Sequence, residues 1–339
     1  MEFHAAAKRV TDAGFAGAAA ERAWWTREYA EAEGNIGGTW RPDDAASLRT
    51  FVDETLEREA ALFDERLAQG RIVEGHGDLH AKHIYVLGSR PEDLVIVDCV
   101  EFSEWFHFRY LDVGYDLAFI AMDLEARGRR DLGDEVAGRY LAATGDETLG
   151  VLQPIHRAFR AFVRGKVESI GANDPGIPAA DRAVLAESAS RYFRLASTYA
   201  ARRREPVLIV MCGASGTGKS LVGGVLAGRI GAAMVSTDAV RSVIAEQRGL
   251  PVTMWQEYEA AAYSPEMNRD VYEEMRRRAG AHLRAGRPAI LDGTHRRATD
   301  REAALAVARE LGVPSILVEL KVSDDAALAR LVNRQRMRG

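Results

Sequence analysis

One segment constrains this chain more than any other: Gly213-Ala-Ser-Gly-Thr-Gly-Lys-Ser220, between an apolar run and a stretch of helical periodicity. It matches the GxxxxGK[ST] phosphate loop in composition and in context. Glycines let such a loop wrap its backbone N–H groups around an anion, and the following helix adds its positive N-terminal end. The segment predicts a nucleoside triphosphate site; the alternative is a glycine-rich turn without a ligand.

The residues of this loop have separate expected roles. Lys219 would reach the β- and γ-phosphates, and the Ser220 hydroxyl would join a Mg2+ shell. Lysine is rare here, at five of 45 basic residues, and codon bias is the simpler explanation of that skew. The remaining expected phosphate contacts come from Gly213, Ala214, Ser215, Gly216, Thr217 and Gly218.

The chain after Pro206 alternates between short apolar runs and helical periodicity. This predicts strands at 207–212, 232–236, 289–291 and 315–320, with helices at 219–230, 265–285, 299–311 and 324–338. Strands alternating with helices form a parallel sheet with helices on both faces. We therefore expect an α/β fold for this part.

Polar residues follow the second and third of these strands, at the sheet edge where open α/β sheets bind ligands. Asp238 could take a proton from a hydroxyl nucleophile, or only cap the next helix. Arg241 could hold a substrate anion. Asp292 is expected near the Mg2+ shell, and His295 fits a substrate-pocket or packing role better than catalysis.

The last expected helix is rich in arginine. A solvated basic face and a lid that neutralises phosphate charge during transfer explain this equally well. The arginines concerned are Arg330, Arg334, Arg336 and Arg338.

Residues 207–339 resemble a P-loop small-molecule kinase of the gluconate-kinase and polynucleotide-kinase-like group. The resemblance rests on the phosphate loop, on Thr237-Asp-Ala-Val-Arg241 and on Leu291-Asp-Gly-Thr-His295. It implies ATP as the nucleotide, with Arg334 in a lid beside it. A further strand and helix follow the lid in that group, so the resemblance also implies a domain without them.

The first part of the chain has a different pattern of apolar residues. Helical periodicity over 1–70 and 111–201 frames two apolar runs, 84–87 and 94–97, that predict a small hairpin. The charged run ending at Pro206 predicts a boundary, giving a mainly α domain at 1–203 and the α/β domain at 204–339.

A second motif, Glu74-Gly-His-Gly-Asp-Leu-His-Ala-Lys-His83, precedes that hairpin. It resembles the catalytic lobe of aminoglycoside phosphotransferases and protein kinases, as does the segment from Arg109. The resemblance implies that Asp78 lies beside an acceptor hydroxyl and that Asp98 binds Mg2+. His83 stands where the family has a metal-binding Asn, and imidazole is a poor Mg2+ ligand.

Two features complicate that reading. His76, His80 and His83 could instead hold zinc, although the hairpin context fits a catalytic loop better. Lys8 is the only lysine before Asp78, and no strand-rich segment precedes residue 70. We therefore expect a kinase-like C-lobe without a nucleotide lobe, which does not transfer phosphate itself.

Together, the two parts resemble bacterial two-domain proteins described as bifunctional aminoglycoside phosphotransferase and ATP-binding proteins, from about residue 45 on. The leading hypothesis is an ATP-dependent kinase for a small hydroxyl-bearing substrate. The alternatives are a non-catalytic ATP sensor and a 5′-hydroxyl polynucleotide kinase.

Composition narrows the choice of partners. The net charge of -5 argues against nucleic acid and against a polybasic membrane patch. The 2 cysteines are too few for a disulfide framework, and the sequence shows neither a membrane-length apolar run nor a signal-peptide core. These features predict a soluble cytoplasmic protein with a small-molecule substrate.

Overall fold

The computed structural model describes residues 2–11, 14, 16–100, 109–201, 205–250 and 264–336. The chain forms two compact units: the first comprises Met1–Ala137 and Leu152–Arg203, and the second Gly138–Val151 and Arg204–Gly339. Two helices, α6 (Arg130–Thr144) and α7 (Leu149–Asn173), therefore contribute residues to both units. Each unit is described by itself.

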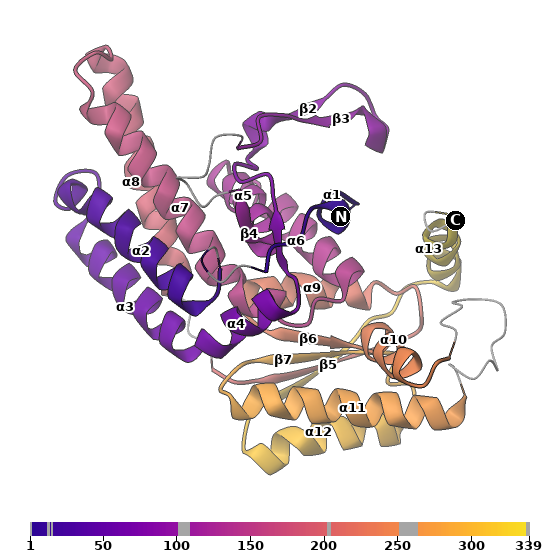
Figure 1. The fold of residues 1–339 in the computed structure, drawn as a ribbon. Coiled ribbons are helices and arrows are strands. Elements are labelled where there is room, and N and C mark those ends of the chain that lie inside the picture. The colour runs from indigo at the N-terminus through magenta and orange to yellow at the C-terminus, as the bar shows by residue number, and fades with distance from the viewer. Residues whose placement is uncertain are drawn as a thin grey trace. The chain divides into compact units, whose positions relative to one another are not determined.

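Helices make up most of the first unit (Figure 1). Besides residues of α6 and α7, they are α1 (Glu2–Ala6), α2 (Ala18–Ala32), α3 (Pro42–Arg58), α4 (Ala60–Ala68), α5 (Val113–Ala126) and α8 (Ala179–Ala200). Aromatic side chains from α2, α7 and α8 pack together in the core. Trp40, just before α3, stacks on Phe193 of α8 at a centroid distance of 4.8 Å. Trp25 of α2 meets Phe159 of α7 edge-on at 4.9 Å.

Two small antiparallel pairs complete this unit. Strands β2 (Ile84–Val86) and β3 (Leu94–Ile96) form the hairpin expected from the sequence. Strands β1 (Ile72–Glu74) and β4 (Tyr110–Asp112) form a pair that the sequence did not predict, because the two segments are distant in the sequence and no turn signal joins them. The mainly α fold with a small hairpin is thus confirmed.

The second unit contains a parallel sheet of four strands in the order β6-β7-β5-β8. The strands are β5 (Leu208–Cys212), β6 (Ala233–Ser236), β7 (Ala289–Asp292) and β8 (Ser315–Glu319). The helices after them are α9 (Lys219–Ile230), α10 (Thr237–Gln247), α11 (Pro265–Arg284), α12 (Ala298–Leu311) and α13 (Asp324–Arg336).

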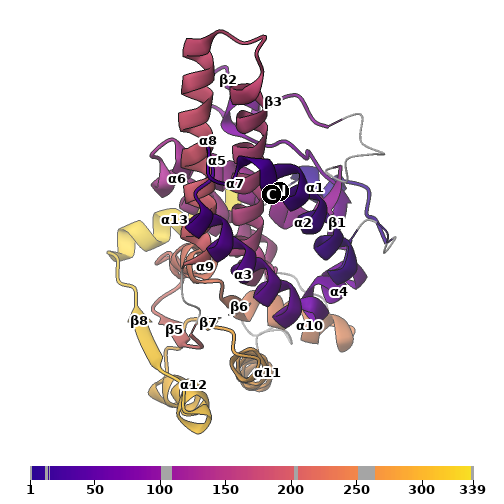
Figure 2. The same cartoon turned by 90° about the vertical axis from the view of Figure 1, so that its left-hand side faces the viewer.

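Helices lie on both faces of this sheet (Figure 2). On one face, alternate strand residues such as Val210 and Leu291 pack with Val271 and Met275 of α11 and with alanines of α12. On the other face, Gly223 of α9 faces Met234 and Ile290, and a Cβ atom there would lie 3.5 and 3.7 Å from their side chains. The α/β prediction with helices on both faces is confirmed.

Candidate functional site

The predicted phosphate loop joins the central strand β5 to α9 at the carboxyl edge of the sheet. Its glycines have positive φ angles: 131° at Gly213, 81° at Gly216 and 95° at Gly218. A Cβ atom at Gly213 would lie 2.4 Å from the carbonyl oxygen of Leu320, and one at Gly216 would lie 2.6 Å from that of Ala327. Backbone conformation and crowding both require glycine here.

Lys219 is the first residue of α9, and its ammonium group lies inside the loop. The side chain is 8% exposed, and Nζ donates a hydrogen bond to the Ala214 carbonyl at 2.6 Å. Thr217 Oγ1 donates to the same carbonyl at 2.9 Å. Burial lowers the pKa of Lys219, and the carboxylate of Asp292 opposes this shift only in part. The loop thus holds a partly desolvated cation, and Ser220 follows it in the first turn of α9.

Two carboxylates lie at the ends of the neighbouring strands. Asp292 ends β7 beside Met211 of β5 and Ser236 of β6, and it is 5% exposed. Asp238 is exposed in the first turn of α10. The negative charges of Asp292 and Asp238 both act to raise the pKa of Lys219, against the larger lowering effect of burial. Both carboxylates therefore act on the loop ammonium.

Asp238 is not the cap of its helix. Ser236 takes that position, and its Oγ accepts a hydrogen bond from the Ala239 amide at 3.2 Å. The capping alternative considered from the sequence therefore does not account for this carboxylate.

Arg241 lies one turn further along α10. It is 6% exposed, and its Nη2 donates to Asn268 Oδ1 of α11 at 2.8 Å. Asp238 and Arg241 are thus on the same short helix, but one is exposed and the other is packed against α11.

The segment after β7 is held to the phosphate loop, to α11 and to β5 by hydrogen bonds that the sequence did not reveal. The Gly213 amide donates to the Thr294 carbonyl at 3.1 Å, and the His295 amide donates to the Tyr272 hydroxyl at 3.1 Å. Burial lowers the pKa of His295, whose Nδ1 lies 2.8 Å from the Met211 carbonyl. His295 is 1% exposed, which fits the packing role considered for it.

Helix α13 passes close to the loop. Arg330 Nη1 donates to the Thr217 carbonyl at 3.3 Å, which brings one of the predicted lid arginines to the loop. Arg334 and Arg336 belong to α13, but their side chains are outside the described part of the chain, and Arg338 lies beyond the described residues.

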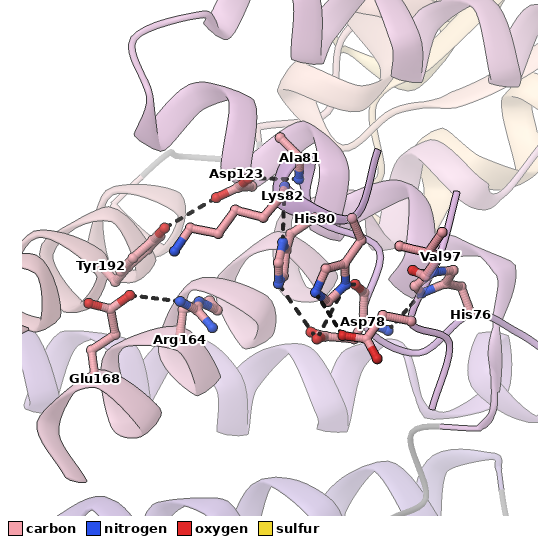
Figure 3. Close-up of polar contacts among 12 residues, drawn as sticks. His76, Asp78, His80, Ala81, Lys82, Val97, Asp123, Arg164, Glu168 and Tyr192 are labelled. Atoms are coloured by element: carbon pink, nitrogen blue, oxygen red, sulfur yellow. Dashed lines mark hydrogen bonds and ion pairs between the residues drawn. The ribbon is translucent and has the colours of Figure 1, made fainter. Parts of the chain in front are cut away.

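The second motif forms an ordered loop between β1 and β2 in the first unit (Figure 3). The buried carboxylate of Asp116 in α5 accepts hydrogen bonds from the amides of His76 and Gly77 at 2.8 and 2.9 Å. His4 of α1 contacts the same carboxylate at 3.1 Å. Asp116 thus positions the backbone that carries Asp78.

Asp78 faces two histidines. Its Oδ2 lies 3.5 Å from His80 Nε2 and 3.7 Å from His83 Nδ1. Burial alone would raise the pKa of Asp78, but the hydrogen bond and charge of His80, together with the charges of Arg160 and His83, lower it overall. Asp98 is 74% exposed in its side chain, has a φ of 66° and contacts His83 Nε2 at 3.2 Å.

His76 does not join a three-histidine group. Its Nδ1 accepts a hydrogen bond from the Asp78 amide at 3.3 Å, and its Nε2 lies 3.0 Å from the Val97 carbonyl. Both ring nitrogens are used by the backbone, so the three histidines considered from the sequence are not brought together around one point.

Comparison with known families covers most of the second unit. Residues 208–339 match the family model described as an AAA domain. This range begins at β5 and contains the phosphate loop, Asp238 and Asp292. The second unit therefore resembles an AAA domain over its sheet and its phosphate loop.

Relatives extend over more of the chain. An uncharacterized protein of Mycobacterium tuberculosis is 34% identical over 301 residues, which cover 86% of this chain and 56% of the relative. An uncharacterized protein of Mycobacterium bovis matches over the same extent and with the same identity. The chain spans about half the length of the curated relatives it matches.

Solved structures resemble a smaller part. A protein of Chloroflexus aurantiacus, provisionally described as a kinase, has a TM-score of 0.34 and 22% identity, over 40% of this chain and 69% of its own. A gluconokinase from Sinorhizobium meliloti has a TM-score of 0.27 and 23% identity, over 40% and 68%. These scores are too low to carry the function of either protein over to this chain.

Proposed function

We propose that the second unit is an ATP-dependent kinase that transfers a phosphoryl group to a small hydroxyl-bearing molecule. The observation that carries this proposal is the buried Lys219 ammonium inside a glycine loop, with the carboxylates of Asp292 and Asp238 at the same sheet edge. A phosphate-binding cation beside two acidic groups provides both halves of a phosphoryl-transfer site.

The residues present fit ATP and Mg2+. The backbone of residues 213–218 and the N-terminal end of α9 offer N–H groups for phosphate oxygens, and Lys219 offers a cation. Ser220 and Asp292 offer the hard oxygen ligands that Mg2+ prefers. When bound, ATP would supply the phosphoryl group, and Mg2+ would offset the negative charge of the phosphates.

Asp238 and the arginines complete the proposed site. The exposed carboxylate of Asp238 would take the proton of the acceptor hydroxyl. Arg241, fixed by Asn268, would hold an anionic group of the substrate, and Arg330 would bring positive charge to the loop. We also propose Arg334 as a nucleotide contact, since it follows Arg330 by one turn of α13.

For the first unit, we propose a fold related to the catalytic lobe of aminoglycoside phosphotransferases. The Asp116 carboxylate that holds the loop of Asp78 supports this relationship. The two roles that it implies, Asp78 beside an acceptor hydroxyl and Asp98 as a Mg2+ ligand, remain part of this proposal. Among the described residues, no helix is long and apolar enough to cross a membrane, and we propose a cytoplasmic location.

Replacing one carboxylate tests the kinase proposal. Transfer of the labelled γ-phosphate of ATP would be measured across sugars, nucleosides, aminoglycosides and a short oligonucleotide. Asp238→Asn should lower kcat by about 10²–10⁴-fold, because it removes the proton acceptor. The KM for ATP should change much less than kcat, because the loop backbone and the Lys219 side chain are kept and Asp292 still faces the ammonium.

The matched control is Asp300→Asn, a carboxylate in the first turn of α12. It should leave kcat at the wild-type value. ATP binding without transfer to any acceptor class would favour the sensor instead, and transfer to the oligonucleotide alone would favour a polynucleotide kinase.

A further inference from the structure

The loop between β1 and β2 brings three potential metal ligands together in the first unit (Figure 3). One ligand atom from each of Asp78, His80 and His83 lies within 4.8 Å of the others. Asp78 Oδ2 is 3.5 Å from His80 Nε2 and 3.7 Å from His83 Nδ1. Ligands about 2.1 Å from a tetrahedral ion are about 3.4 Å apart. Small side-chain movements would therefore close this group around an ion.

His83 gives a second, independent indication. Its Nδ1 lies 3.0 Å from the Asp78 carbonyl oxygen, and its Nε2 lies 3.2 Å from Asp98 Oδ2. A neutral imidazole has one N–H, so one of these contacts sets a lone pair against an oxygen. A metal ion on Nδ1 removes the conflict, because Nε2–H then donates to Asp98. Metal-bound histidines are commonly oriented by a carboxylate in this way.

The surroundings also fit an ion with an open position. His80 is 6% exposed, whereas the side chain of Asp78 is 38% exposed. Three protein ligands on the buried side would leave a fourth position toward solvent for water or a substrate oxygen. Two contacts must be given up. His83 Nδ1 must turn away from the Asp78 carbonyl, 3.0 Å from it, to face the ion. His80 Nδ1 accepts from the Lys82 amide at 3.3 Å, and metal binding through Nε2 moves the ring proton to Nδ1.

We propose that Asp78, His80 and His83 bind one divalent transition-metal ion of the zinc class, with Asp98 positioning His83. This assignment is the alternative to the acceptor and Mg2+ roles that the resemblance implies for Asp78 and Asp98, and both cannot hold at once. The donor set of two imidazoles and one carboxylate favours such an ion over Mg2+ or Ca2+, which prefer all-oxygen sites. The site belongs to the first unit and is independent of the phosphate loop, so it stands or falls separately from the proposed kinase activity.

Metal titration of the full chain tests this site. Chelator-treated protein would be titrated with Zn2+ and followed by calorimetry. A parallel titration with Co2+ would be followed by visible absorption, and we expect the wild type to show the spectrum of tetrahedral Co2+. We expect one ion per chain. His80→Ala, His83→Ala and Asp78→Asn should each abolish that binding event, and circular dichroism would verify that each variant is folded.

Two further variants sharpen the test. Asp98→Asn keeps all three ligands and should weaken Zn2+ binding by about 10–100-fold, because it removes only the group that orients His83. Asp93→Asn changes a carboxylate of the same hairpin, paired with Arg90, and should bind Zn2+ as the wild type does.

Three results would overturn the proposal. The first is the absence of stoichiometric Zn2+ binding, which would mean that a second ring proton satisfies His83. The second is wild-type binding by a folded His83→Ala variant. The third is loss of binding in His76→Gln with retention in Asp78→Asn, which would indicate a site made of histidines instead.

Discussion

Glu21 of α2 is a carboxyl group that the fold buries almost completely. It is 4% exposed, and the Tyr115 hydroxyl of α5 donates to its Oε2 at 2.5 Å. Burial raises the pKa of Glu21 to about 8, since removal from water disfavours the charged form. In the unfolded chain the group titrates near its usual value of 4.5. Its contribution to stability is therefore complete below that value and declines as the pH rises toward 8.

Replacing this carboxyl group should remove that part of the pH dependence. Glu21→Gln cannot ionise and keeps an oxygen that accepts from Tyr115. As the pH is raised from 5 to 8, we expect the melting temperature of the wild type to fall more than that of Glu21→Gln. Thermal unfolding of both proteins across this pH range would measure it, and parallel curves would show that Glu21 is not buried as a neutral acid.

The phosphate loop was the part most accessible to prediction. Its glycines, the strand before it and the helix after it all give local signals, and the structure has this strand–loop–helix order. The bond from Arg330 to the Thr217 carbonyl and the contact of Tyr272 with Thr294 gave no such signal. They join segments distant in the sequence, which only the packing of the sheet brings together.

Helix α13 restricts the space at Gly216 of the phosphate loop, whereas a glycine in an ordinary turn such as Gly286 has open space around it. Gly216 and Gly286 both have positive φ angles, 81° and 73°. A Cβ atom at Gly216 would meet the Ala327 carbonyl at 2.6 Å, whereas one at Gly286 would meet no atom within 4 Å. The conformational cost of a side chain applies to both positions, and the collision applies to Gly216 alone.

Alanine at each position separates these effects. Gly286→Ala should lose about 1–2 kcal/mol of unfolding free energy from its φ angle. Gly216→Ala should lose more, because α13 or the loop must shift, and its ATP affinity should also fall. Urea denaturation and ATP titration would measure both quantities. Equal losses with equal ATP affinities would indicate that α13 does not contact the loop.

The chain as a whole divides less simply than its sequence indicates. Composition changes near residue 204, yet the segment Gly138–Val151 belongs to the second unit. Glu147 of this segment contacts Arg278 and His282 of α11, and its carbonyl accepts from the Met234 amide. Long-range contacts of this kind leave no trace in local periodicity, which is why the segment was not predicted.

Two compact units predict more than one unfolding transition. A ligand stabilises only the structure it binds, by about 2.7 kcal/mol when its concentration is 100 times its Kd. MgATP should therefore raise the temperature of one calorimetric transition and leave another in place. If MgATP shifts neither transition, the result would contradict a nucleotide site in the second unit.

The most direct test of the account is ATP binding by the full chain with one lysine changed at a time. Lys219 is buried in the phosphate loop, whereas Lys321 of the same unit is exposed and paired with Glu319. Calorimetric titration with MgATP should show binding in the wild type and in Lys321→Ala, and at least a hundredfold loss of affinity in Lys219→Ala. Equal affinities in all three proteins would contradict the assignment of the nucleotide site.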